Sequence, residues 1–342
     1  MVLRRCGARL IAENAIQATR PAADSRTWIR RPTNSRGFAW IFGELACTGA
    51  VVALSLLSFA RIGSGWGWPF VWFAAQIILG LLLFQWFVLM HSCGHRALFA
   101  SRRLNDVFGH VASAFCLVPY SSWRYVHAQH HRWVGWMDKD STTRGLAGPL
   151  PPPRAQRVMN FCWKFWIPIF SLAFGVSGFW NLKHVASVAP SVGQRRQALF
   201  SVIFLGLVYA ALIAWAGGRF LQVWPVAFLC FLTIGDPILL SQHVHLPLHK
   251  TGGATVAPFA AADQDPFTRT IVVPPWVAQW VFLQFTTHGA HHAYPHVAHY
   301  DLERVPFSSV HAISLTAWLK AAKRMPATRL LYESSRDTGI FI

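Results

Sequence analysis

The stretch PFVWFAAQIILGLLLFQWFVLM, residues 69–90, contains no charged side chain and leads directly into HSCGH, residues 91–95. An apolar run of this length reaches the roughly 20 residues that a helix needs to cross a hydrocarbon core about 30 Å thick. The sequence therefore predicts a membrane-spanning helix that ends in two histidines, His91 and His95, at one surface of the membrane.

The composition of the whole chain agrees with a membrane protein. Of its 342 residues, 54% are hydrophobic and 13% are charged, whereas a soluble domain carries about 25% charged residues. Three further apolar runs are long enough to span the bilayer, and they cover residues 39–60, 197–216 and 220–240. Together with residues 69–90 they predict two helical hairpins, which are closed by the short loops 61–68 and 217–219.

Three weaker apolar stretches, residues 107–119, 161–180 and 272–286, predict interfacial or half-buried helices. We therefore expect an all-α membrane protein. It should contain four transmembrane helices in two hairpins, interfacial helices, and a cytoplasmic cap rich in histidine. The expected divisions are a basic N-terminal tail (residues 1–38), a membrane domain (39–310) and a C-terminal cytoplasmic segment (311–342).

The distribution of positive charge predicts the orientation in the membrane. The formal net charge is +18. Nucleic acid is not the expected partner, because the basic residues lie between apolar runs, where they set topology and bind anionic headgroups. Of the 31 lysines and arginines, only Arg61 and Arg219 lie in the two short loops. The positive-inside rule then predicts that both termini and the long central segment are cytoplasmic. If residues 161–180 crossed the membrane, the predicted side of every later segment would be reversed.

Four clusters contain most of the sixteen histidines. They read HSCGH (91–95), HAQHH (127–131), QHVHLPLH (242–249) and HGAHH (288–292). Under the predicted topology all four face the cytoplasm, and this agreement is independent, because the topology used only lysine and arginine. Spacings of three and four residues place two or three rings on one face of a helix.

The number of clustered histidines favours two metal ions over one. Three clusters offer at least eight imidazole ligands, and the cluster at 242–249 offers a ninth. A structural zinc binds four ligands, and a catalytic zinc binds three plus water, so eight or nine ligands suit two ions. Imidazole binds zinc, copper, iron and nickel, so the ligands alone leave the metal open.

The chain resembles the membrane fatty acid desaturase family, most closely its acyl-lipid branch, from residue 40 to about residue 310. The matching stretches, in the family's order, are HSCGHRALF, HAQHHRWVGWMDKD, FGVSG, QHVHLPLH, DQDPFTRTI and THGAHHAYPHVAHYDLERV. The resemblance implies two iron ions, dioxygen as co-substrate, and two electrons, used to introduce a double bond into a lipid acyl chain. The implied ligands are His91, His95, His127, His130, His131, His243, His288, His291 and His292. His243 follows Gln242 and is preferred as the ninth ligand, with His245 as the alternative.

Several polar residues near the clusters have two interpretations. The family's first box often reads His-Asp-x-x-His, and here Ser92 replaces the aspartate, which weakens ring orientation or signals a different substrate or reaction. Asp236 lies seven residues before His243 and either hydrogen-bonds a ligand ring or is solvated near its helix end. Asp138 and Asp140 are expected to be solvated loop charges, with support of second-cluster rings as the alternative. The histidines expected outside the ligand set are His110, His184, His249, His296, His299 and His311.

Three functions fit these patterns. The first is an oxygen-dependent di-iron acyl-lipid desaturase, which we expect. The second is a related di-iron hydroxylase or ketolase acting on a hydrocarbon, fatty acyl or carotenoid substrate. The third is a zinc transporter or metal-storage protein; a transporter places its ligands near the middle of the bilayer, whereas these follow the ends of apolar runs. No His-Pro-Gly-Gly motif of a fused cytochrome b5 is present, so a separate ferredoxin or cytochrome is expected to supply the electrons.

Overall fold

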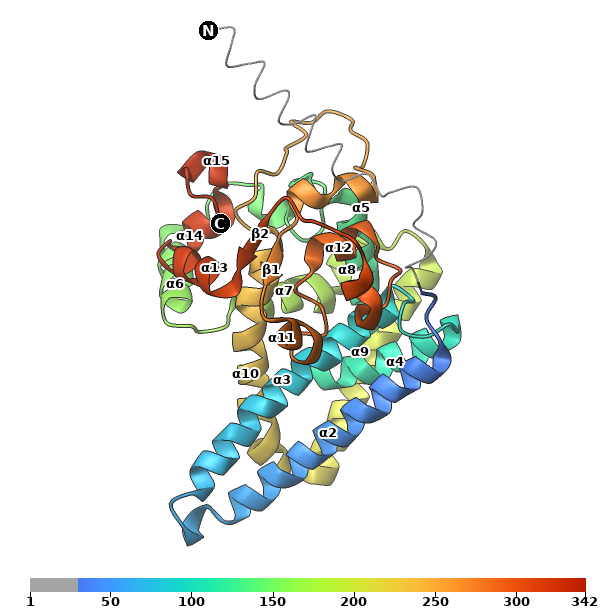
Figure 1. Cartoon of the computed structure of the whole chain (residues 1–342), viewed down its shortest axis with the longest axis vertical. Coiled ribbons are helices and arrows are strands. Elements are labelled where there is room, and N and C mark those ends of the chain that lie inside the picture. Colours follow the sequence, from blue (N-terminus) through green and yellow to red (C-terminus); the bar gives the residue numbers. More distant parts are fainter. Residues whose placement is uncertain (1–29) are drawn as a thin grey trace, which may run out of the picture.

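The computed structural model describes residues 30–342; most of the predicted basic tail lies outside them. Four long helices dominate the described part (Figure 1): α2 (Asn34–Ala60), α3 (Trp68–Gly94), α9 (Val192–Ala216) and α10 (Gly218–His243). All four are long and apolar enough to cross a membrane, which confirms the four predicted spans. Gly217 joins α9 to α10 with a φ of 54°, a left-handed conformation that glycine adopts without steric cost.

The helix α3 is the central member of the four. It packs against α2, α10 and the shorter helix α4 (Arg102–Cys116). In its most apolar window 72% of the residues are buried, against 17% in α9. The outer helix α9 instead presents Leu207 and Trp215 to the surroundings, with 66% and 85% of each side chain exposed. Large exposed apolar surfaces of this kind mark contact with a membrane.

The remaining elements form a cap at one end of the spanning helices (Figure 1). The loop between α2 and α3, which contains η1 (Ile62–Ser64), lies at the opposite end. The cap elements before α9 are α5 (Tyr120–Trp133), η2 (Arg144–Leu146), α6 (Pro153–Lys164), α7 (Phe170–Phe174), the π-helix η3 (Gly175–Trp180) and α8 (Leu182–Val188). Those after α10 are η4 (Ala261–Asp263), η5 (Asp265–Phe267), β1 (Thr270–Val272), α11 (Pro275–Trp280), α12 (His288–Ala293), η6 (His299–Arg304), β2 (Ala312–Ser314), α13 (Leu315–Lys323), α14 (Ala327–Tyr332) and α15 (Ser335–Thr338).

The apolar stretch 161–180 is divided among three elements and does not form a fifth long helix. The helix α6 ends at Lys164, Trp166 takes a positive φ of 60°, and Pro168 follows before α7 begins. The carboxylate of Asp236, on α10, accepts hydrogen bonds from the backbone N–H groups of Phe170 and Ser171 at 3.2 and 2.6 Å. These contacts pair N–H groups that the start of a helix leaves without partners. They also hold the start of α7, and with it the break between α6 and α7, against α10.

The predicted helix at 272–286 is only partly correct. Its first residue belongs to β1, and the helix α11 ends at Trp280. The strand β1 pairs in parallel with β2, with Ile271 opposite Ile313. A pair of three-residue strands leaves no alternating pattern long enough to recognise. The divisions expected at residues 38/39 and 310/311 stay a prediction.

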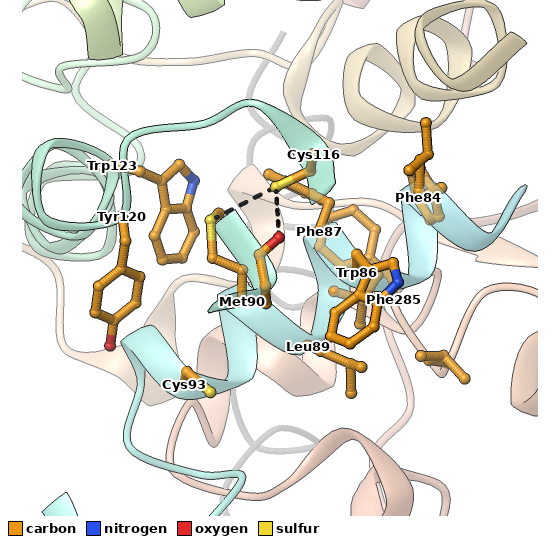
Figure 2. Close-up of a cluster of buried hydrophobic side chains, with 14 of the residues drawn as sticks. Phe84, Trp86, Phe87, Leu89, Met90, Cys93, Cys116, Tyr120, Trp123 and Phe285 are labelled. Atoms are coloured by element: carbon orange, nitrogen blue, oxygen red, sulfur yellow. Dashed lines mark hydrogen bonds between the residues drawn. The ribbon is translucent and has the colours of Figure 1, made fainter. Parts of the chain in front are cut away.

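The core beside the cap is aromatic and continues into the histidine clusters. Figure 2 shows Phe84, Trp86, Phe87 and Met90 of α3 packed with residues of α4, α5 and the segment after α11. Trp86 stacks on Phe115 of α4 with ring centroids 4.1 Å apart. Because close-packed cores tolerate little movement, the last turn of α3 is held in a fixed position.

Candidate metal centre

The first two clustered histidines come from the end of α3. His91 lies in its last turn and His95 caps it. The ring of His91 contacts Phe285 and Trp123, with both centroid separations at 5.3 Å. The α3 core therefore positions the first pair of rings.

The helix α5 supplies three rings, and they separate to its two sides. His127 and His131 are four residues apart, and their Nε2 atoms lie 3.0 Å from each other. His130 instead places its Nε2 atom 3.3 Å from that of His292. Successive helix residues are about 100° apart, so positions i and i+4 lie close together while i+3 lies to the other side. The sequence predicted a shared face, and the structure divides that face between two groups.

The short helix α12 divides its rings in the same way. His291 places Nε2 3.1 Å from Nε2 of His131. His288 and His292 join the other group, with their own Nε2 atoms 3.1 Å apart. His243, the last residue of α10, completes that group with Nε2 2.7 Å from that of His288.

Two compact groups of imidazole nitrogens result. Within each group the potential ligand atoms all lie within 4.8 Å of one another. Two imidazoles at right angles around one ion, with bonds of about 2.1 Å, would hold their nitrogens about 3 Å apart, which agrees with the separations above. The five-histidine group is His91, His95, His127, His131 and His291, and the four-histidine group is His130, His243, His288 and His292.

The chemical state of these rings fits metal binding. Burial, followed by repulsion from neighbouring imidazoles, holds the pKa of His127, His291 and His292 well below the usual value, so the rings are neutral, the form that coordinates metal. The Nε2 atom of His91 is buried and has no hydrogen-bond partner. A buried polar atom without a partner costs free energy, and a metal ion at this position would remove that cost.

Residues around the four-histidine group orient its rings. His130 Nδ1 donates to the Asp140 carboxylate at 2.7 Å, and His292 Nδ1 donates to Gln264 Oε1 at 3.0 Å. His243 Nδ1 donates to the carbonyl of Phe267 at 3.0 Å. Fixing the proton on Nδ1 leaves the lone pair of Nε2 directed into the group. Asp140 therefore supports the second cluster, whereas its neighbour Asp138 accepts from the backbone N–H of Thr251.

The structure shows the contacts of two residues, His245 and Asp236, whose roles the sequence left open. His245 does not belong to either group, because its Nε2 atom hydrogen-bonds Thr338 Oγ1 at 2.8 Å, so His243 and not His245 is the ninth clustered histidine. Asp236 is engaged by the start of α7. Both interpretations from the sequence are therefore wrong: the Asp236 carboxylate does not hydrogen-bond a ligand ring, and it is buried instead of solvated.

Ser92 and His299 form a buried pair that the sequence did not reveal. Ser92 Oγ and His299 Nδ1 are 3.1 Å apart, so the serine links the first cluster to the segment after the last one. The remaining histidines outside the groups make other contacts: His110 Nδ1 meets the carbonyl of Asp106, His184 Nδ1 accepts from Arg144, and His296 is exposed. His249 packs against Phe267, and burial lowers the pKa of His311.

A pocket opens beside the five-histidine group. His91, His95 and His291 line one side of it. Most of the rest of its wall is apolar and comes from Val88, Ala97, Leu283, Phe285, Pro295, Val297 and Leu302. The open space is small, about 20 Å³, so the pocket marks an apolar side of the metal centre and not a channel of acyl-chain length.

Four helices of spanning length and two histidine groups able to hold metal define a membrane protein whose metal ligands are clustered histidines. Residues 66–306 match the family model described as fatty acid desaturase, and the chain belongs to that family. It is similar to a probable fatty acid desaturase of Sorghum bicolor, with 27% identity covering 83% of this chain and 72% of the relative.

Two further relatives have more explicit names. An acyl-lipid omega-3 desaturase (cytochrome b5) of the endoplasmic reticulum of Arabidopsis thaliana is 26% identical, and the match covers 86% of this chain and 75% of that relative. An sn-1 acyl-lipid omega-3 desaturase (ferredoxin) of Nostoc sp. (strain 36) is 23% identical, and the match covers 80% of this chain and 74% of that relative. The expected membrane fatty acid desaturase, an oxidoreductase acting on lipid acyl chains, is confirmed.

Proposed function

We propose that the nine clustered histidines bind two iron ions, five at one ion and four at the other, and that the enzyme desaturates acyl chains with dioxygen. The separation of the Nε2 atoms into two compact groups is the observation that carries the proposal. Iron with dioxygen supplies the oxidising power for an unactivated C–H bond that side-chain acids and bases lack. The resemblance to desaturases favours iron among the metals that imidazole binds.

Apolar residues of the chain lie beside the proposed metal centre, where the reacting carbon would be held. The pocket beside the five-histidine group has an apolar wall that includes Val88, Leu283 and Phe285. We propose that this apolar wall borders the stretch of the acyl chain that reacts, which would give the positional control that the reaction needs. We propose an acyl group carried on a membrane lipid as the substrate, supported by the acyl-lipid relatives.

The electron donor and the orientation complete the proposal. Relatives are named with cytochrome b5 and with ferredoxin, which supports a separate cytochrome or ferredoxin as the donor.

The charge distribution supports an integral membrane protein whose termini and histidine groups are cytoplasmic, because only two of 31 basic residues lie in the short loops.

Expression in a host that lacks polyunsaturated lipids tests the function. Wild type should produce a new double bond, detected by lipid profiling, and His291→Ala should abolish it, because the five-histidine group loses a ligand. The control His184→Ala, outside both groups, should keep the product. An inserted oxygen in place of a double bond would indicate the hydroxylase or ketolase, and an unchanged profile from iron-loaded wild type would contradict the proposal.

A further inference from the structure

Arg269 lies completely inside the cap, between η5 and β1, with none of its surface exposed. Arginine is almost never buried to this degree unless a carboxylate pairs with it. In the part of the chain that the structure describes, Arg269 forms no ion pair with a carboxylate. The buried acid four residues earlier, Asp265, accepts instead from Ser309 Oγ and from the backbone N–H of Val310. The charge of Arg269 is therefore not balanced by an opposite full charge in contact with it.

The guanidinium of Arg269 keeps its charge at neutral pH. Burial lowers its pKa to about 9, which still leaves the group protonated. Its Nε and Nη2 atoms are buried and have no hydrogen-bond partner. Burying a charge in this way costs free energy. An apolar side chain in place of a buried charge is often neutral or stabilising, so packing alone does not require an arginine at this position.

The contacts of Arg269 hold the chain on both sides of His243. Its backbone N–H donates to the carbonyl of Gln242 at 2.9 Å, and its Nη1 atom donates to the carbonyls of Ser241 and Val244. Carbonyls at the end of a helix have no partners within the helix, so these bonds fix the end of α10. The strand β1, which begins at the next residue, lies at the cap end of α10 (Figure 1).

The side chain of His243 is held by the same segment. Its Nδ1 atom donates to the carbonyl of Phe267, two residues before Arg269, at 3.0 Å. Its Nε2 atom lies 2.7 Å from that of His288 within the four-histidine group. The guanidinium therefore bonds to the backbone on either side of a residue whose ring belongs to that group.

Arg269 and Asp140 place opposite charges beside the four-histidine group. The Asp140 carboxylate contacts His130, whereas Arg269 lies at the end of α10 that carries His243. The carbonyl oxygens that accept from Arg269 carry only partial negative charge, so they offset its full charge incompletely. A positive charge repels a ferric ion more strongly than a ferrous ion, and between neighbouring charges in a protein interior this difference exceeds a tenfold change in an equilibrium.

We propose that Arg269 positions His243 and that its unpaired charge raises the reduction potential of iron bound by the four-histidine group. The inference rests on the proposed function, because it needs iron at that group. It assigns a task to a buried charge that the packing of the cap does not require.

Redox titration of the full-length enzyme in lipid nanodiscs, loaded with the Mössbauer isotope of iron and frozen at fixed potentials, tests the effect of the charge. The iron signal that His292→Ala removes identifies the four-histidine group. Arg269→Met should lower the ratio of ferrous to ferric iron in this signal at least tenfold at a fixed potential, a shift of about 59 mV for one electron. The iron of the five-histidine group should shift less. Arg269→Lys restores a cation and should bring the potential back toward that of wild type.

Arg195→Met is the matched control. Arg195 Nε donates to the carbonyl of Ala189 at the end of α8, so the variant removes the same charge and a similar contact that involves no clustered histidine. It should leave both potentials at their wild-type values.

Iron content, measured on the same samples, separates the outcomes. Full iron content with unchanged potentials in Arg269→Met would overturn the inference. Loss of the four-histidine iron from both Arg269→Met and Arg269→Lys would overturn the role of the charge, because only the hydrogen-bonding geometry of the guanidinium would then matter. Wild type that binds no iron at the four-histidine group would instead count against the proposed function.

Discussion

The Asp140 side chain shows how one residue controls a ligand ring. Its carboxylate accepts from His130 Nδ1, and its other oxygen accepts from the backbone N–H of Thr142 at 2.8 Å. Both Asp140 and His130 are buried, so water cannot replace the contact. Spacing along the sequence suggested a loop charge, because the turn that folds residue 140 back onto α5 leaves no periodic signal.

Replacing Asp140 should weaken metal binding at the four-histidine group. Asp140→Ala removes the acceptor for His130 Nδ1, and loss of such a partner typically costs about 10–100-fold in metal affinity or activity. Asp140→Asn keeps an oxygen acceptor and should retain more of both. Metal content of the purified variants measures the effect, with Asp138→Ala, which does not contact a clustered histidine, as the control. Equal metal content in Asp140→Ala and wild type would contradict the assigned role.

At the scale of elements, the break between α6 and α7 keeps the stretch 161–180 from forming a long helix. Asp236 holds this break by accepting from two backbone N–H groups of α7. The contact joins α7 to α10, the helix that ends in His243. The break therefore preserves the arrangement in which both hairpins deliver histidines to the same end.

Removing this cap should lower the stability of the protein. Asp236→Ala leaves the N–H groups of Phe170 and Ser171 without their acceptor, and loss of a helix cap costs about 1 kcal/mol. Asp236→Asn keeps one acceptor oxygen and should lose less. The thermal unfolding midpoint in detergent measures the difference. A midpoint for Asp236→Ala equal to that of wild type would show that the contact does not anchor α7.

The spans and their histidines were predictable from sequence because each depends on local spacing. Apolar runs of spanning length identified α2, α3, α9 and α10, and the spacings of HSCGH, HAQHH and HGAHH identified eight of the rings in the two groups. The division of the rings between groups was not predictable, because it depends on how α5 and α12 are oriented. The Ser92–His299 pair and the Gln264–His292 contact join residues far apart in the chain, so no periodicity reveals them.

At the scale of the whole molecule, the charge distribution predicts which side of the membrane each end occupies. A cysteine introduced at exposed Ser64, in the α2–α3 loop, should react with a membrane-impermeant thiol reagent added outside intact cells. A cysteine at exposed Arg336, near the C-terminus, should react only after the cells are opened. Labelling above that of the parent chain measures both. The opposite pattern would reverse the orientation.

The most direct test of the account is the iron content of the purified, active protein, measured by elemental analysis together with Mössbauer spectroscopy. We predict two iron ions per chain in two distinct environments, because the nine imidazoles form one group of five and one of four. One metal ion per chain, or zinc in place of iron in protein that forms product, would contradict the account.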